Sequence, residues 1–148
     1  MFHGMTDPNE MREALLSGLT ADRSRLPGHL GLEVVELEHG RSRLRMGIER
    51  HHLAHNGYLH AGSVVTLADT TAGFGCIASL PEGAMSMTTI ELKVNFLGTV
   101  TEGTLVSVGT LAHAGRSTQV WDVEVSDESS GKVIALFRCT QFILYPRT

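Results

Sequence analysis

The chain has 148 residues, of which 42% are apolar and 19% are charged, and its formal net charge is −4. This size and composition are typical of one globular domain with a single core. The slightly acidic balance offers no basic stripe for nucleic acid or an anionic membrane. No apolar run reaches the roughly 18 residues that span a bilayer, and the start lacks a signal-peptide layout. We expect a soluble cytoplasmic protein that binds neither nucleic acid nor membrane.

The first predicted element is a short amphipathic helix at residues 8–19. Asp7 supplies a capping acceptor, Pro8 occupies the first helical position, and apolar residues follow at helical spacing. Residues 20–31 contain a proline, glycines and several polar side chains, which indicates a connector. We expect residues 1–30 to form an N-terminal helix and connector, and residues 31–148 to form the main domain.

Two strands are predicted next, at residues 32–38 and 41–49. The turn His39-Gly40 between them is typical of a hairpin, because glycine readily adopts positive φ. The second strand alternates strictly between an apolar face and a charged face, so one side is buried and the other is solvated. The face expected to be buried carries Ser42, Leu44, Met46 and Ile48. This pattern favours an antiparallel sheet.

A buried helix is predicted at residues 63–80. This run is small and apolar around nearly all of its circumference, as in a helix enclosed by other elements, and Pro81 and Gly83 end it. Four alternating strands follow at residues 86–97, 104–113, 118–126 and 133–144, with short turns that predict an antiparallel meander. We therefore expect an α+β fold in which a curved antiparallel sheet wraps around one central helix.

Asp69 is the residue that fits its surroundings least. It lies in the middle of the apolar helix, where an unpaired carboxylate is costly and its pKa should be raised. An acid in such a place is a candidate functional residue. The alternative is a structural aspartate bonded to Thr70, Thr71 or a neighbouring loop.

The start of the same helix is a second candidate feature. Around His60, Ala61, Gly62 and Ser63, free backbone N–H groups converge at the positive end of the helix dipole, where they can polarise a carbonyl oxygen. Asp69 lies eight residues beyond Ala61, which is about 12 Å along the axis and too far to act on the same carbonyl carbon. If both act in one reaction, they come from different chains, so we predict a site at a homodimer interface.

Neither the histidines nor the cysteines indicate a metal site or a disulfide. His51, His52, His55 and His60 fall within ten residues, but their spacing fits no HExxH pattern and neither Glu nor Cys lies among them. We expect solvated or capping histidines and no metal. Cys76 and Cys139 lack a CxxC partner and lie in apolar runs, so we expect reduced core residues.

The helix start and Asp69 together resemble a known family signature. The run Asn56-Gly57-Tyr58-Leu59-His60-Ala61-Gly62, followed by Leu67-Ala68-Asp69, resembles the G-x-x-H-G-G-x-x-x-x-L-x-D signature of the hotdog-fold acyl-CoA thioesterases. The phenylacetate-degradation (PaaI-like) branch is the most similar, and residues 89–97 also resemble its strand after the helix. The resemblance covers about residues 30–145. It implies a hotdog fold, an acyl-CoA substrate, self-association as a dimer or tetramer, and no cofactor.

The resemblance also implies roles for individual residues. Asp69 matches the general base or nucleophile, and Thr89 matches a Ser/Thr position that orients the attacking water. The backbone N–H at Ala61, with Gly62 beside it, would bind the thioester oxygen. His60 would fix the turn by hydrogen bonds, and Gly57 matches the glycine of the approach loop.

Two positions depart from the family pattern. Ala61 replaces the first glycine after the histidine, which is acceptable if its φ is negative, because the useful group is a backbone N–H. Ala54 occupies the position where the family has Asn or Gln. A polar side chain that contacts the substrate from this loop would therefore have to be His55 or Asn56. Arg116, on a predicted turn, is a candidate partner for a coenzyme A phosphate, and the alternative is a solvated turn arginine.

The sequence therefore predicts an acyl-CoA thioesterase that needs no metal or cofactor. A thioester carbonyl is already electrophilic, so a polarised oxygen, a positioned carboxylate and a water suffice. The alternative is a non-catalytic acyl-CoA binding or sensing module, since one fold serves several functions. A dehydratase is disfavoured because its His and acid pair on a proline-containing loop is not present.

Overall fold

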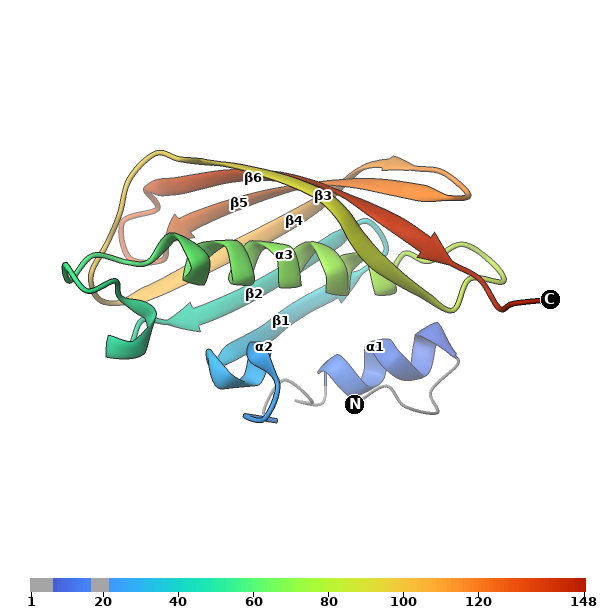
Figure 1. Ribbon diagram of the computed structural model, residues 1–148, viewed down its shortest axis with the longest axis horizontal. Coiled ribbons are helices and arrows are strands. Elements are labelled where there is room, and N and C mark those ends of the chain that lie inside the picture. The colour runs from blue at the N-terminus through green and yellow to red at the C-terminus, as the bar shows by residue number, and fades with distance from the viewer. Residues whose placement is uncertain (1–6, 17–21) are drawn as a thin grey trace.

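The computed structural model describes residues 7–16 and 22–148 (Figure 1). In chain order the regular elements are α1 (Pro8–Leu16), α2 (Leu26–His29), β1 (Leu32–Glu38), β2 (Arg41–Gly47), the 3-10 turn η2 (Arg50–His52), α3 (Ala61–Ile77), β3 (Ser86–Phe96), β4 (Thr104–Ala114), β5 (Thr118–Asp127) and β6 (Val133–Leu144). The predicted strands agree with these bounds to within two residues. The central helix begins two residues earlier and ends three earlier than its predicted bounds.

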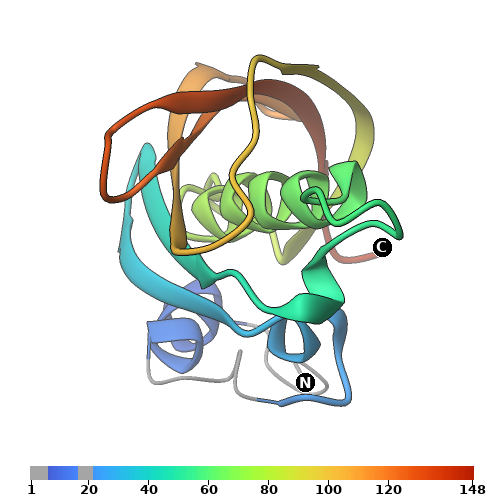
Figure 2. The same cartoon turned by 90° about the vertical axis from the view of Figure 1, so that its left-hand side faces the viewer.

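All six strands form one antiparallel sheet in the order β1-β2-β4-β5-β6-β3. The sheet curves around α3, which lies along its inner face, as Figure 2 shows most clearly. The predicted α+β architecture, a curved sheet around one buried helix, is therefore confirmed. Within the described ranges, no helix is both long and apolar enough to cross a membrane.

The predicted meander is wrong in one respect. β3 pairs with β6 and not with β4, which instead pairs with β2. The connection at residues 97–103 carries the chain from one edge of the sheet across to the β1–β2 hairpin (Figure 2). This crossover places β4 between β2 and β5, so that the first hairpin and the later strands form a single sheet that covers α3. It also places β3 at an edge of the sheet.

Small residues allow α3 to lie close to the sheet. A Cβ at Gly75 would meet the Trp121 ring at 2.7 Å and the Ser42 hydroxyl at 2.8 Å. The buried core on the inner face includes Leu44, Leu67 and Trp121, each fully enclosed. Because most of the helix surface is covered in this way, α3 needs no continuous polar stripe, which explains its largely apolar sequence.

The N-terminal segment packs outside the sheet edge formed by β1. Met11 and Leu15 of α1 are buried against β1 and α3, and the Arg12 Nε donates to the Leu37 carbonyl at 2.9 Å. The predicted continuation of this helix to Leu19 lies outside the described residues. The predicted connector contains one short helix, α2, which its proline and glycine content did not indicate.

Both cysteines are buried free thiols, as predicted. Burial raises the pKa of Cys76 and of Cys139 to about 12, so both keep their protons at neutral pH.

Candidate active site

Asp69 lies half-buried on α3 and contacts the neighbouring strand β3. The Thr89 hydroxyl is 2.9 Å from Asp69 Oδ1. Burial raises the pKa of the Asp69 carboxyl, and the hydrogen bond from Thr89 partly opposes that rise. The alternative partner Thr71 is engaged elsewhere, because its hydroxyl contacts the Leu67 carbonyl and the Ser107 hydroxyl. The structure therefore brings together the two side chains that the sequence proposed as base and water-orienting group.

A bulge in β3 turns Thr89 toward Asp69. Thr89 is the register partner of buried Gln141, and Leu92 is the partner of buried Cys139, with the register shift at the residues between them. Ile90 is thereby displaced and is 57% exposed. Bulges often re-aim a side chain beside an active site. Simple alternation, with Ile90 and Leu92 on one face, would have placed Thr89 on the outer face.

The start of α3 is capped by the side chain of His60. Its Nδ1 accepts a hydrogen bond from the Gly62 N–H at 2.8 Å, which places the proton of the neutral ring on Nε2. A Cβ on Gly62 would lie 3.0 Å from this nitrogen, a tight contact that glycine avoids. Ala61 has negative φ, as every described non-glycine residue does, and no hydrogen bond of the described residues takes its N–H. Of the two predicted oxyanion donors, the Ala61 N–H is available to a ligand, whereas the Gly62 N–H donates to the His60 ring.

The loop before α3 is closed by backbone pairing. Leu53 and Leu59 form an isolated bridge, and the Ala54 N–H donates to the Tyr58 carbonyl at 2.7 Å. Gly57 has a φ of +85°, which explains the need for glycine at this turn. Asn56 Oδ1 accepts from the Tyr58 N–H at 3.2 Å. His55 and Asn56 are both exposed at this turn, so their predicted role in binding remains a prediction.

His52 is an anchor for this loop that the sequence reasoning missed. Its buried ring accepts from the Glu49 N–H at 2.9 Å and its Nε2 lies 2.8 Å from the Leu30 carbonyl, and burial lowers the pKa of the ring. Its own carbonyl accepts from the His60 N–H and from the Ser63 hydroxyl. The residue thus holds the helix start in place. No local signal separates it from its neighbours in the histidine cluster.

The described residues contain no group of three or more His, Cys, Asp or Glu side chains that could hold a metal ion. The clustered imidazoles instead contact one another, with the His51 and His52 ring centroids 4.2 Å apart and those of His29 and His51 5.9 Å apart. The absence of a cofactor remains a prediction.

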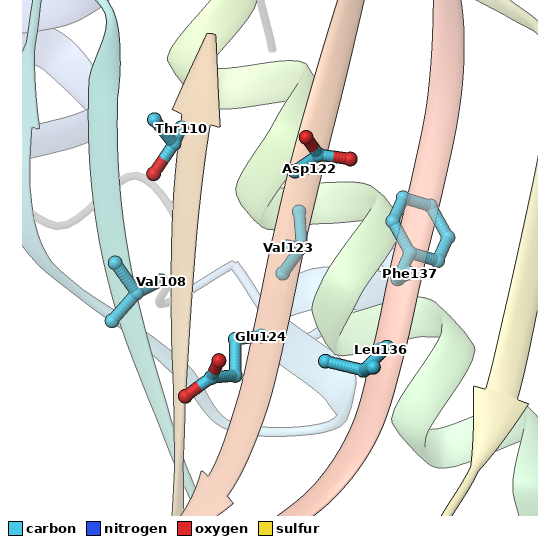
Figure 3. Close-up of a pocket in the computed structure, with 7 residues that line it drawn as sticks. All are labelled: Val108, Thr110, Asp122, Val123, Glu124, Leu136 and Phe137. Atoms are coloured by element: carbon cyan, nitrogen blue, oxygen red, sulfur yellow. The ribbon is translucent and has the colours of Figure 1, made fainter. Parts of the chain in front are cut away.

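Two other features lie away from Asp69. Arg116 occupies the turn between β4 and β5, where its guanidinium carbon is 5.2 Å from the centre of the Tyr145 ring, in a hollow beside the C-terminal end of α3. A second hollow lies on the outer face of the sheet, over β4, β5 and β6, with α3 on the other side (Figure 3). The sheet therefore separates this hollow from Asp69.

Comparison with known proteins identifies the family to which this arrangement belongs. The model of the thioesterase superfamily matches residues 56–134, the stretch that holds the capped helix start, Asp69 and Thr89. The chain belongs to the thioesterase superfamily. A 1,4-dihydroxy-2-naphthoyl-CoA hydrolase from Listeria monocytogenes is 30% identical over 111 residues, which are 75% of this chain and 89% of that protein.

Other relatives agree with this membership. The acyl-coenzyme A thioesterase PaaI of Escherichia coli is 28% identical over 110 residues, covering 74% of this chain and 75% of that protein. The crystal structure of a Haemophilus influenzae thioesterase matches with a TM-score of 0.79 at 25% identity, covering 88% of this chain and 90% of that chain. The predicted hotdog fold and the predicted thioester-hydrolase class are confirmed.

Proposed function

We propose that this thioesterase hydrolyses acyl-CoA thioesters, with Asp69 as general base. The hydrogen bond between Asp69 and Thr89 is the observation that carries the proposal. A water that contacts the free carboxylate oxygen and the Thr89 hydroxyl would be positioned to attack a thioester carbonyl. Its proton passes to Asp69, the C–S bond breaks, and the same proton then leaves with the coenzyme A sulfur. The raised pKa of Asp69 makes it a stronger base than an ordinary carboxylate.

The oxyanion of the intermediate requires donors that Asp69 does not supply. The N–H of Ala61 is open, and it lies at the positive end of the α3 dipole. It is about 12 Å along the helix from Asp69, because eight residues at 1.5 Å each separate them. We propose that a second copy of the chain provides this N–H, so each site uses Asp69 and Thr89 of one subunit and the helix start of the other.

The choice of a CoA thioester rests on the relatives. The Listeria and Escherichia proteins are named for CoA-linked substrates, and they cover most of this chain. Arg116 is retained as a candidate contact for a coenzyme A phosphate, since its guanidinium lies at the surface of the β4–β5 turn. A bound substrate would have to approach that turn for the contact to form.

Release of free thiol from a panel of CoA thioesters tests the proposal. The panel contains short alkyl, long alkyl, phenylacetyl and hydroxybenzoyl groups, each measured with wild type, Asp69→Asn and Thr89→Ala. We expect Asp69→Asn to reduce turnover by a factor of about 10² to 10⁴, the range for a lost general base. Thr89→Ala should cost less, because it orients the water but does not take the proton.

Binding measurements with the same panel distinguish a hydrolase from a non-catalytic acyl-CoA binding module. A chain that binds one thioester tightly and leaves every thioester intact is a binding module, and the proposal then fails. An Asp69→Asn variant that retains the wild-type rate would be consistent with thioester hydrolysis but would contradict the proposed role of Asp69 as general base.

A further inference from the structure

Two buried side chains next to Thr89, those of Gln141 and Cys139, are not used in the mechanism above. The side chain of Gln141, on β6, is fully buried, and its Oε1 position is 3.1 Å from the Thr89 hydroxyl oxygen. Its Nε2 position is 3.4 Å from the sulfur of Cys139 on the same strand. Gln141 is also the register partner of Thr89, so the strand pairing itself holds the two residues side by side.

The hydroxyl of Thr89 has a single proton, yet two oxygen atoms lie within reach of it. Asp69 Oδ1 is 2.9 Å away and the amide oxygen of Gln141 would be 3.1 Å away. An ionised carboxylate can only accept, so the proton is needed by Asp69, and an amide oxygen facing Thr89 would then have no donor. Turning the amide about its last bond removes this conflict, because it brings the NH₂ group toward Thr89.

The turned amide also satisfies Cys139. Its oxygen then faces the sulfur, and a thiol that is fully buried and keeps its proton can donate to that oxygen. The result is one directed chain of hydrogen bonds, from Cys139 S–H to Gln141, from the Gln141 N–H to Thr89, and from the Thr89 O–H to Asp69. Each of these four side chains then has at least one partner, which is the usual condition for polar groups that are buried, as those of Gln141 and Cys139 are.

We infer that Gln141 is a positioning residue, whose buried amide fixes the Thr89 hydroxyl so that its proton points at Asp69. A hydroxyl oxygen has two acceptor sites. Gln141 occupies one of them, and the other stays open toward the site, where the attacking water can donate to it. This inference rests on the proposed function, because it assigns Thr89 the role of orienting that water. Because its side chain is fully buried, Gln141 acts through Thr89 and not on the substrate directly.

Nuclear Overhauser contacts in the wild-type protein test the amide orientation without any turnover. We expect the side-chain amide protons of Gln141 to show contacts to the Thr89 methyl group. Contacts from those protons to the Cys139 methylene alone would place the amide oxygen on Thr89 and overturn the inference. These Overhauser contacts do not depend on hydrolysis. A protein that hydrolyses no thioester would contradict the proposed function, and the contacts would still decide the orientation of the Gln141 amide.

Gln141→Met tests the consequence for catalysis. Methionine keeps the unbranched shape and suits a core, but it has no N–H to donate. We expect kcat to fall about tenfold with KM unchanged, and the acid limb of the kcat/KM profile to move to higher pH, because a mobile Thr89 hydroxyl stabilises the Asp69 carboxylate less. In a Thr89→Ala background the same substitution should cost nothing further, since Gln141 acts only through Thr89.

Gln119→Met is the matched control. Gln119 is equally buried, is the β5 register partner of Gln141, and bonds to the Ser79 carbonyl and the Trp121 ring nitrogen. We expect it to lower Tm without moving the acid limb, and to combine additively with Thr89→Ala. A Gln141→Met variant that behaves like this control would show a purely structural role and overturn the inference.

Discussion

At the scale of single residues, Asp69 is retained at a cost to stability. Burial raises its pKa above the ordinary value of 3.8, so the folded protein disfavours the charged form. Between 3.8 and the raised value, the folded chain binds more protons than the unfolded chain, and stability is therefore lost as pH rises through that window. Above the raised pKa the carboxyl is charged and the full cost is present. This is the trade between function and stability that is common at active sites.

Asp69→Asn should therefore stabilise the fold at neutral pH while it removes activity. We expect Tm at pH 7 to rise by a few degrees, at roughly 2–4 °C for each kcal/mol in a chain of this size. The gain should shrink as pH falls toward 3.8, where the wild-type carboxyl also becomes neutral. Thermal melts between pH 7.5 and pH 4 measure both effects.

Asp122→Asn provides a control of opposite sign. Arg138 lies 2.6 Å from Asp122 and lowers the pKa of that carboxyl, so its charge contributes stability above pH 3.8. This variant should not raise Tm at pH 7. A stabilisation by Asp69→Asn that is the same at every pH would show that burial of the charge is not its cause.

The sequence identified Asp69 because a charge inside an apolar helix is visible without any structure. It could not identify Gln141, because a glutamine at an inward position of an alternating strand has no distinguishing local pattern. Its role depends on Thr89, which lies 52 residues away and meets it only when β3 pairs with β6. Thr89 itself was found by resemblance, since the bulge at Ile90 that turns it inward follows no simple alternation.

At the scale of elements, the close contact between α3 and the sheet depends on Gly75. Alanine has a higher intrinsic helix propensity than glycine by about 1 kcal/mol. A Cβ at this position, however, would lie 2.7 Å from the Trp121 ring. That ring is fully buried and its nitrogen donates to Gln119, so it has no room to move away. Overpacking of this kind costs about 1–3 kcal/mol, which exceeds the gain in propensity.

Gly75→Ala should accordingly lower the free energy of unfolding. Urea denaturation at one fixed protein concentration measures it, because self-association would make the midpoint depend on concentration. Gly73→Ala is the comparison within the same helix. Its Cβ would meet only the terminal methyl of Met87, which is the far end of a flexible side chain, so its cost should be clearly smaller. Equal costs at the two positions would contradict the argument from Trp121.

The sequence predicted most elements well, because alternation, capping residues and turn residues are local signals. The order of the strands was harder to predict. The six residues 98–103 resemble one more hairpin turn in length, yet they carry the chain from the edge strand β3 past β6 and β5 to β4, which lies beside β2. Only the need to enclose α3 from both sides decides that path, and this is a property of the assembled sheet.

At the scale of the whole molecule, β3 is an exposed edge strand of the sheet. It is 11 residues long and, among residues 7–16 and 22–148, pairs with β6 on one side only, so its other side presents backbone groups without a strand partner there. Three of its apolar side chains are substantially exposed, with Ile90 at 57%, Leu92 at 40% and Phe96 at 47%. Long apolar edges are normally covered in native proteins. A second copy, related by a two-fold axis, would cover this edge with the same strand.

Phe96→Lys should therefore convert a dimer into monomers and reduce turnover in parallel. Phe96 lies seven residues along β3 from Thr89, about 23 Å in an extended strand, so the new charge cannot act directly on the Asp69 carboxylate. Leu136→Lys is the matched control, since Leu136 is 45% exposed on the outer face of β6. Sedimentation equilibrium and thiol release on the same samples should show dimer and activity lost together in Phe96→Lys and retained in Leu136→Lys. A monomeric Phe96→Lys protein with wild-type turnover would show that one chain completes the oxyanion site unaided, and the shared site would then be wrong.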